Sequence, residues 1–282
     1  YITTGTGHYF GMDLSYDYGF EQNQLNGNIA GVKWRSKSSN KKRAYGFDYD
    51  ASNRLLQADY NQNSGVAWEK TESNFSTNYD YDVNGNITKL NRKGVVLGSI
   101  QMIDSLVYNY MNTGRSNRLA AVDDFAGDLG QGDFVDGNVL GDDYDYDANG
   151  NMKSDANKSI TNISYNHLNL PVTVTFTDNR TITYTYDAAG IKLKKTVNDN
   201  GTVTTTDYLA GFIYENDELQ FFAHDEGRVR KNEGGFVYDY FIKDHLGNTR
   251  MTITEAVDST VYFASLETEY ENFEENIFLN LD

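Results

Sequence analysis

Tyr79-Asp80-Tyr81-Asp82-Val83-Asn84-Gly85-Asn86-Ile87 is the stretch of sequence that decides the fold of this chain. Near copies of it run from Tyr144 to Met152 and from Tyr184 to Ile191. In each copy two tyrosines flank an acidic or polar residue, a turn follows, and a bulky apolar residue comes after the turn. A repeat of this kind predicts an array of small units, none of which can bury its apolar face alone.

The order of residues in the motif predicts a strand, a turn and a second strand. Side chains two apart on a strand share a face, so Tyr79 and Tyr81 are expected to stack on one side of a sheet. Asp82 stands at the entrance of the turn, where a carboxylate accepts backbone N–H groups in an Asx-type turn. Gly85 is expected at the position with positive φ, and Ile87 returns to the apolar face. Every residue type therefore has a structural role, and none requires a catalytic one.

Period-2 alternation extends well beyond the motif. Thr181–Tyr186 and Val172–Phe176 interleave apolar and β-branched residues, and steps such as Asn200-Gly201 separate such runs. The one proline of the chain leaves the ladders otherwise uninterrupted. We predict an all-β protein, an antiparallel sheet with one hairpin per unit of about 20 residues. Only Glu267–Phe278 has the composition of a helix.

We predict a single repeat array over residues 1–282. The Gly- and Asp-rich stretch 123–143 is expected to be a flexible inserted loop rather than a domain boundary. The copies are marked by their second tyrosine and by the acid and glycine that follow it. These candidate repeat residues are Tyr49, Asp50, Tyr81, Asp82, Gly85, Tyr110, Tyr146, Asp147, Gly150, Tyr165, Tyr186, Asp187, Gly190 and Tyr240.

Composition narrows the class of protein and its partners. A net charge of −17 argues against nucleic acid as a partner, because phosphates would be repelled. The chain has no cysteine, which excludes disulfides, thiolate catalysis and cysteine-ligated zinc. No apolar run reaches the roughly 18 residues of a membrane helix, so membrane insertion is not expected. Because the chain begins at Tyr1 without an initiator Met, we expect it to be a piece of a longer polypeptide.

Calcium is the main alternative explanation of the motif. Asp80-x-Asp82-x-Asn84-Gly85 matches the opening of an EF-hand loop, as does the copy that begins at Asp145. However, the position that needs a bidentate Glu holds Asn91 in one copy and Ala156 in the other. The flanks are also strands rather than helices. We therefore favour the turn and predict no metal and no cofactor.

The sequence predicts no enzyme. His224-Asp225 and Asp244-His245 could form an acid–base pair, but a turn or packing role is favoured for His245. No nucleophile elbow and no phosphate loop occur. Trp34 and Trp68 could belong to a carbohydrate platform, although a core role is favoured. The acidic run from Glu267 to Glu275 is either a solvated face or a docking surface for a basic partner.

The motifs resemble the YD repeats of bacterial RHS proteins. A more specific resemblance is that of Tyr238 to Arg250 to the RHS repeat-associated core segment, with matching positions at 244–250. The order of Asn117-Arg118-Leu119, a Gly/Asp-rich insert, Asp143–Met152 and Glu267-Thr268 is similar to the version found in Bacteroidota. Together these matches cover most of residues 45–282. The positions that match the core segment are Asp244, His245, Leu246, Gly247, Asn248 and Arg250.

The resemblance implies that the sheet spirals into a hollow shell, of which this chain is a part. Such a shell encloses the protein's own C-terminal toxin until delivery to competing cells. The expected partners are that cargo, the remaining shell repeats, and secretion-system or cell-surface proteins. The Bacteroidota version implies type 9 secretion, and therefore a secreted or bacterial cell-surface location.

One departure from the family concerns toxin release. Members that release their toxin carry an autoproteolytic aspartate motif with an Asp-Pro step, whereas Pro171 follows Leu170 here. The sequence therefore supports a shell, but it gives no support for cleavage or toxicity. The alternative is an extracellular surface module that binds carbohydrate or protein.

Overall fold

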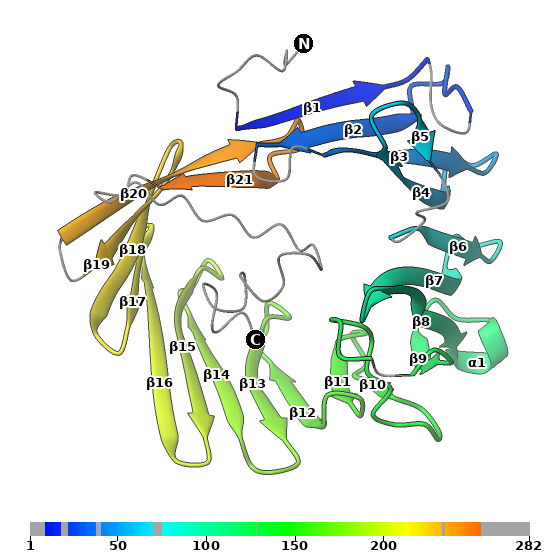
Figure 1. The fold of residues 1–282 in the computed structure, drawn as a ribbon. Coiled ribbons are helices and arrows are strands. Elements are labelled where there is room, and N and C mark those ends of the chain that lie inside the picture. Colours follow the sequence, from blue (N-terminus) through cyan, green and yellow to red (C-terminus); the bar gives the residue numbers. More distant parts are fainter. Residues whose placement is uncertain are drawn as a thin grey trace. The chain divides into compact units, whose positions relative to one another are not determined.

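The computed structural model describes residues 9–17, 22–37, 41–69, 75–127, 129–232 and 235–254. These residues form antiparallel hairpins that lie side by side, with one helical turn, α1 (Met111–Gly114), among them (Figure 1). The prediction of an all-β, antiparallel fold is confirmed. The helix predicted at Glu267–Phe278 falls outside the described residues. No helix in the described part of the chain is long and apolar enough to cross a membrane.

The first sheet has nine strands in the order β1-β2-β3-β4-β6-β7-β8-β9, and β5 pairs with β4. Neighbouring strands follow one another in the sequence, so the sheet is a meander of hairpins. Its strands are β1 (Phe10–Ser15), β2 (Gly31–Ser36), β3 (Lys42–Tyr49), β4 (Leu55–Asn63), β5 (Trp68–Glu69), β6 (Thr77–Tyr81), β7 (Ile87–Val96), β8 (Ser99–Tyr110) and β9 (Leu119–Asp124).

The second sheet has twelve strands that run in sequence order from β10 to β21. It is also a pure meander, in which each described strand pairs antiparallel with the next. Its strands are β10 (Tyr144–Tyr146), β11 (Met152–Asp155), β12 (Ile160–Tyr165), β13 (Pro171–Phe176), β14 (Thr181–Tyr186), β15 (Lys192–Asp199), β16 (Thr202–Leu209), β17 (Phe212–Glu215), β18 (Glu218–His224), β19 (Gly227–Asn232), β20 (Gly235–Lys243) and β21 (Thr249–Thr254).

The chain divides into two compact units. Among the described residues, the first holds those up to Asn109 together with Val122–Asp136, and the second holds Tyr110–Ala121 and those from Gly137 onward. The chain passes between the units at Asn109/Tyr110, at Ala121/Val122 and at Asp136/Gly137, and the last of these points lies inside the stretch 123–143. A single array over residues 1–282 stays a prediction.

Hairpin connections alternate between the two ends of the strands, because the sheets are meanders. In the first sheet, every second connection contains a copy of the motif loop or, after β8, the longer loop that follows Tyr110. In the second sheet, the motif loops are the connections after β10, β12, β14 and β20. Several of the others are tight turns with positive φ, such as Leu97-Gly98 and Asn200-Gly201. The motif loops of each sheet therefore all lie at the same end of its strands.

The first sheet buries aromatic side chains in a continuous ladder on one face. The ring of Trp34 stacks on Tyr45 with centroids 5.6 Å apart, and Tyr45 meets the edge of Tyr60 at 5.6 Å. Tyr60 in turn meets Phe75 at 5.2 Å. Such cross-strand aromatic pairs each contribute roughly 0.2–1 kcal/mol. The ladder explains how a chain with 39% apolar residues can hold a sheet together.

Candidate functional site: the Tyr-Asp loop

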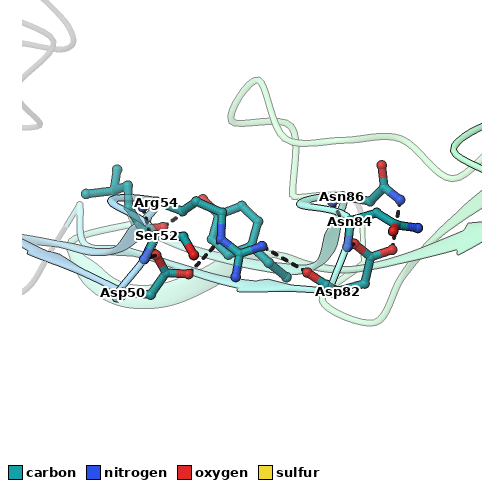
Figure 2. Close-up of polar contacts among 8 residues, drawn as sticks. Asp50, Ser52, Arg54, Asp82, Asn84 and Asn86 are labelled. Carbon is teal, nitrogen blue, oxygen red and sulfur yellow. Dashed lines mark hydrogen bonds and ion pairs between the residues drawn. The ribbon is translucent and has the colours of Figure 1, made fainter.

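Asp82 holds the loop between β6 and β7 with both of its carboxylate oxygens. Its Oδ1 accepts the backbone N–H groups of Asn84 and Asn86, at 2.9 and 2.8 Å. Its Oδ2 accepts the side-chain amide of Asn86 at 2.8 Å, as Figure 2 shows. The backbone closes the loop from Asp82 N to Asn86 O at 2.9 Å. The expected Asx-type turn at Asp82 is therefore present.

The same five-residue loop recurs after β3, β10, β12, β14 and β20. We number its positions from the Asp or Asn that follows the strand, and we name each loop by that residue. In every copy the first side chain accepts the backbone N–H groups of the third and fifth residues. The loops begin at Asp50, Asp82, Asp147, Asn166, Asp187 and Asp244.

The fourth loop position has a left-handed backbone in every copy. Gly85 and Gly150 have φ values of 90° and 89°, and Asn53 and Asn169 have values of 62° and 57°. Only glycine or asparagine stands there, because these residues adopt positive φ at the lowest cost. The role predicted for Gly85 is therefore present.

A β-bulge precedes each loop. Asp80 pairs with Lys89, yet the next residue, Tyr81, pairs with Ile87, so that Thr88 is passed over. The same shift occurs at Tyr49, Tyr146, Tyr165, Tyr186 and Lys243. A bulge of this kind turns the last strand residue relative to its neighbours. At Tyr81 the bulge stands beside a tyrosine whose hydroxyl contacts the preceding hairpin.

Where a tyrosine stands directly before a motif loop, it joins its hairpin to the preceding one. Its hydroxyl donates to the backbone carbonyl of the first residue after the preceding motif loop, at 2.7 Å from Tyr81 to Leu55, for example. Equivalent bonds of 2.6–2.9 Å run from Tyr146 to Leu119, from Tyr165 to Met152 and from Tyr186 to Pro171. A repeat of this kind offers a hydroxyl to the hairpin before it and a carbonyl to the hairpin after it. We call this contact the tyrosine latch.

Two candidate tyrosines depart from the simple motif. Tyr110 ends β8, but Met111 follows it, and the longer loop closes through Met111 N to Arg118 O at 2.9 Å. Tyr240 lies in the middle of β20 and pairs with Gly227 and Ile253. The residue that stands directly before the Asp244 loop is Lys243, which occupies the bulge position that tyrosine holds elsewhere.

The 244–248 segment is a complete copy of the loop. Asp244 accepts the N–H groups of Leu246 and Asn248 at 2.9 Å each, and its Oδ2 also accepts Arg250 Nε at 2.8 Å. Its side chain has no exposed surface. His245 is exposed at the second loop position. The core signature is therefore the same turn, reinforced by one arginine.

Neither the copy of the motif at residues 26–29 nor the tyrosine latch was predicted from the sequence. Asn26-Gly27-Asn28-Ile29 repeats Asn84-Gly85-Asn86-Ile87 letter for letter, and the carbonyl of Ile29 accepts the hydroxyl of Tyr49 at 2.9 Å. Identity of these four residues was the signal that could have revealed the copy. The latch leaves no local signal, because its two partners lie up to 27 residues apart.

The carboxylates of the loop serve the turn as hydrogen-bond acceptors. Burial acts to raise the pKa of Asp82, but the side-chain and backbone hydrogen bonds from Asn86, and that from Asn84 N, outweigh it and lower the pKa. In Asp244 the same balance, with Asn248, Leu246 and Arg250 as donors, lowers the pKa to about 2. These oxygens already accept hydrogen bonds from N–H groups that point at them. No metal-binding cluster of His or acidic residues occurs among the described residues.

A buried carboxylate ties the last three strands together. Asp239 on β20 is 1% exposed and accepts Nε of Arg228 at 2.8 Å and Nε of Arg230 at 2.6 Å. Thr254 on β21 donates its hydroxyl to the same carboxylate at 2.9 Å. Burial acts to raise the pKa of Asp239, but these donors lower it to about 2. The group is fully engaged and has no free oxygen for chemistry.

Two open pockets lie among the described residues of the first unit. The larger, about 320 Å³, is lined by Tyr79, Leu106 and Phe134 and by the ion pair of Arg92 with the buried Asp104. Asp104 also accepts Phe134 N at 2.7 Å, which fixes part of the 123–143 stretch against the sheet.

The smaller pocket, about 130 Å³, is lined by Trp34 and Trp68 together with basic side chains. The basic residues are Lys33, Arg35 and Lys42.

Comparison with models of protein families and with curated proteins finds no match for this chain. Among solved structures, a Tc holotoxin pore of Photorhabdus luminescens matches at 14% identity and a TM-score of 0.48, over 87% of this chain and 14% of that one. The crystal structure of TcdB2-TccC3 matches at 14% identity and a TM-score of 0.47, over the same shares of the two chains. The same complex without its hypervariable C-terminal region matches at 14% identity and 0.48, over 86% of this chain and 14% of that one. This chain thus spans 14% of the length of those chains.

Proposed function

We propose that this chain is part of the wall of a hollow β-shell in a secreted RHS-type protein. The observation that carries the proposal is the tyrosine latch. A latched repeat presents a hydroxyl to one neighbour and a carbonyl to the other, so hairpins can be added to the sheet one at a time. A wall built in this way can be extended until it encloses a volume.

The proposed cargo is the protein's own C-terminal toxin, held until it is delivered to competing cells. Support comes from the Asp244–Asn248 segment, which resembles the core segment of RHS proteins and is a reinforced copy of the loop. We further propose that the parent protein is exported by type 9 secretion and acts as a secreted or cell-surface protein. The described residues fit a passive role, because Asp82, Asp239 and Asp244 direct their oxygens to structural donors.

Limited proteolysis of the complete parent polypeptide tests enclosure. A protease site placed in the cargo should resist cleavage in the intact protein and become sensitive after the shell is opened by denaturant. A matched site in an exposed turn, at Asn200-Gly201, should be cut in both states. Equal cleavage of the two sites in the intact protein would contradict the proposal.

The second candidate function is binding of an extracellular carbohydrate. Its support is the pocket that Trp34 and Trp68 line, since aromatic side chains and a few polar groups are typical of ligand sites. A glycan array should then give dose-dependent signals that Trp68→Ala abolishes. An array without signals, or signals unchanged in Trp68→Ala, would exclude this function.

A further inference from the structure

The larger pocket of the first unit is formed by one face of the sheet and by the segment that follows β9. On the sheet, two neighbouring rows of paired residues on β6, β7 and β8 line it. Directly paired residues point to the same face of a sheet, and so do residues two apart on a strand. The first row is Thr77, Arg92 and Asp104, and the second is Tyr79, Leu90 and Leu106.

Phe134 completes the lining, and hydrogen bonds hold its segment on the sheet. Its backbone N–H donates to Oδ1 of Asp104 at 2.7 Å, and Arg92 Nη2 donates to the carbonyl of Gly132 at 3.0 Å. Asp104 is 2% exposed, so the group to which the segment is fastened is itself buried. Both sides of the pocket are therefore positioned by specific contacts.

The described lining of the pocket carries no net charge. Its charged residues, Arg92 and Asp104, form an ion pair with each other. Asp104 uses both carboxylate oxygens, one for Arg92 Nε and one for the N–H of Phe134. An anionic ligand would compete with Asp104 for the arginine, and a cationic ligand would be repelled by the guanidinium. The lining therefore favours a neutral ligand.

Three polar groups of the lining bond none of the described residues. They are the hydroxyls of Thr77 and Tyr79 and Nη1 of Arg92. Burial raises the pKa of Tyr79, although Arg92 acts against it, so the tyrosine hydroxyl is protonated at neutral pH. A hydroxyl both donates and accepts, whereas a guanidinium only donates. Hydroxyl groups on a ligand can bond all three, because they too both donate and accept.

The remainder of the lining is apolar, and the space is small. Leu90, Leu106 and Phe134 offer hydrocarbon surface. The volume of about 320 Å³ lies at the lower end of the range of about 300–1,000 Å³ that is typical of small-molecule sites. A ligand of one ring matches this lining if it has carbon–hydrogen faces for the apolar residues and hydroxyls for the polar groups. Neutral hexoses have this chemistry.

We infer that this pocket binds a neutral hexose unit. A carbon–hydrogen face of the ring packs against the two leucines and Phe134, and the sugar hydroxyls bond the three polar groups of the lining. The site is separate from the pocket that Trp34 and Trp68 line. The inference does not depend on the proposed shell.

Saturation-transfer NMR of this chain with the methyl glycosides of glucose, galactose and mannose tests the site. At least one of them should receive saturation at its ring protons, with a dissociation constant of about 1 mM for a ligand of this size. Glucuronate and glucosamine have the same ring with one charge. They should bind at least about fivefold more weakly than the neutral sugar, because the ion pair is already complete.

Two variants of the lining locate the sugar. Phe134→Ala removes an apolar side chain but keeps the N–H on Asp104, and it should reduce the transfer below detection. Phe125→Ala is its control, because Phe125 belongs to the same 123–143 stretch, is 73% exposed and lies outside the pocket lining. Phe125→Ala should leave the transfer unchanged.

Tyr79→Phe removes only the hydroxyl and should weaken binding about fivefold, the effect of one hydrogen bond. Tyr184→Phe is its control, since Tyr184 stands at the same motif position beside Tyr186 and lies outside the pocket lining. It should leave binding unchanged. Should Phe134→Ala fail to fold by circular dichroism, Tyr79→Phe, which keeps the ring, decides alone.

Three results would overturn the inference. They are absence of transfer to every neutral hexose, binding unchanged in Tyr79→Phe, and stronger binding of a charged sugar than of a neutral one. Binding that is lost in Trp68→Ala but kept in Phe134→Ala would place the sugar in the other pocket and would equally overturn it. None of these outcomes bears on whether the complete shell protects its cargo from protease.

Discussion

Asp82 and its counterparts show why one residue type recurs at the start of the loop. A single carboxylate oxygen accepts two backbone N–H groups that the turn would otherwise leave without partners. Asn166 does the same with its amide oxygen, at 2.9 and 3.0 Å. Geometry, more than charge, is therefore what the position requires.

Asp82→Ala and Asp82→Asn separate these two requirements. Alanine removes the acceptor of both backbone N–H groups and should lower the melting temperature and the urea midpoint clearly. Asparagine keeps an acceptor at the same place, as Asn166 does, and should change both values little. Circular dichroism melts of the two variants check this. A loss in Asp82→Asn as large as that in Asp82→Ala would show that charge dominates.

The tyrosine latch predicts a small and specific loss from Tyr81→Phe. Phenylalanine keeps the ring but leaves the carbonyl of Leu55 without its donor, which should cost about 1 kcal/mol. Tyr238→Phe is the matched control, because Tyr238 stacks on Tyr240 at the surface and its hydroxyl donates to none of the described residues. Urea unfolding should show the loss in the first variant alone. Equal losses would mean that the latch adds no stability.

The low pKa of Asp244 predicts how stability depends on pH. Its pKa in the folded chain is about 2, below the ordinary value of 3.8. A depressed pKa stabilises the fold above the unfolded value, and the stabilisation is lost as pH falls through the folded one. Urea midpoints should therefore be steady from neutral pH to about pH 5 and fall between about pH 4 and pH 2.

Asp244→Asn isolates this contribution. Asparagine keeps the loop, as Asn166 does, but cannot titrate. The difference in urea midpoint between the native chain and the variant should be constant above about pH 5, shrink as the pH falls through about 2, and reach its low-pH limit at about pH 1. A difference that is the same at all pH values would show that Asp244 does not titrate as its hydrogen bonds imply.

At the scale of elements, the pairing of β19 with β20 depends on one glycine. A Cβ on Gly227 would lie 1.9 Å from the carbonyl oxygen of Asp239, a distance that the two backbones cannot accommodate without separating. Gly227→Ala should therefore cost about 3 kcal/mol or more. Gly201→Ala is the control, since it has positive φ but no atom within 4 Å of the added Cβ, and it should cost only about 1 kcal/mol. Similar losses in the two variants would contradict the close approach.

The strands and turns were largely predictable from the sequence, whereas the contacts between neighbouring hairpins were not. Alternation of Thr181–Tyr186 and the Asn200-Gly201 step depend on neighbours in sequence, and the structure has a strand and a turn there. The bulge before Tyr81 leaves no mark in the sequence, because it depends on which residue of the partner strand is passed over. Local physics determines a hairpin, but its lateral contacts need the neighbouring hairpin to be in place.

The roles of the candidate repeat residues were likewise predictable where they depend on neighbours in sequence, and not where they depend on another hairpin. The roles of Asp82 and Gly85 follow from turn chemistry and could be derived from spacing alone. The role of Tyr81 could be derived only in part: stacking on Tyr79, with centroids 6.4 Å apart, is a local property, but the hydroxyl acts on Leu55 in another hairpin. Tyr240 was predicted to mark a repeat, but Lys243 rather than Tyr240 stands directly before the Asp244 loop.

At the scale of the whole molecule, the proposed role is that of a wall built from repeated hairpins. Several neighbouring hairpins are joined by the tyrosine latch. Enclosure of cargo would then be a property of the complete array.

Cryo-electron microscopy of the complete parent polypeptide tests the central claim, enclosure by a wall of latched hairpins, most directly. The account predicts continuous β-walls around a closed cavity, with density for the C-terminal segment inside it. It also predicts a tyrosine hydroxyl on the carbonyl of the preceding repeat wherever a tyrosine stands directly before a motif loop of the wall. Two flat sheets without a closed cavity, or a C-terminal segment folded outside the wall, would contradict it.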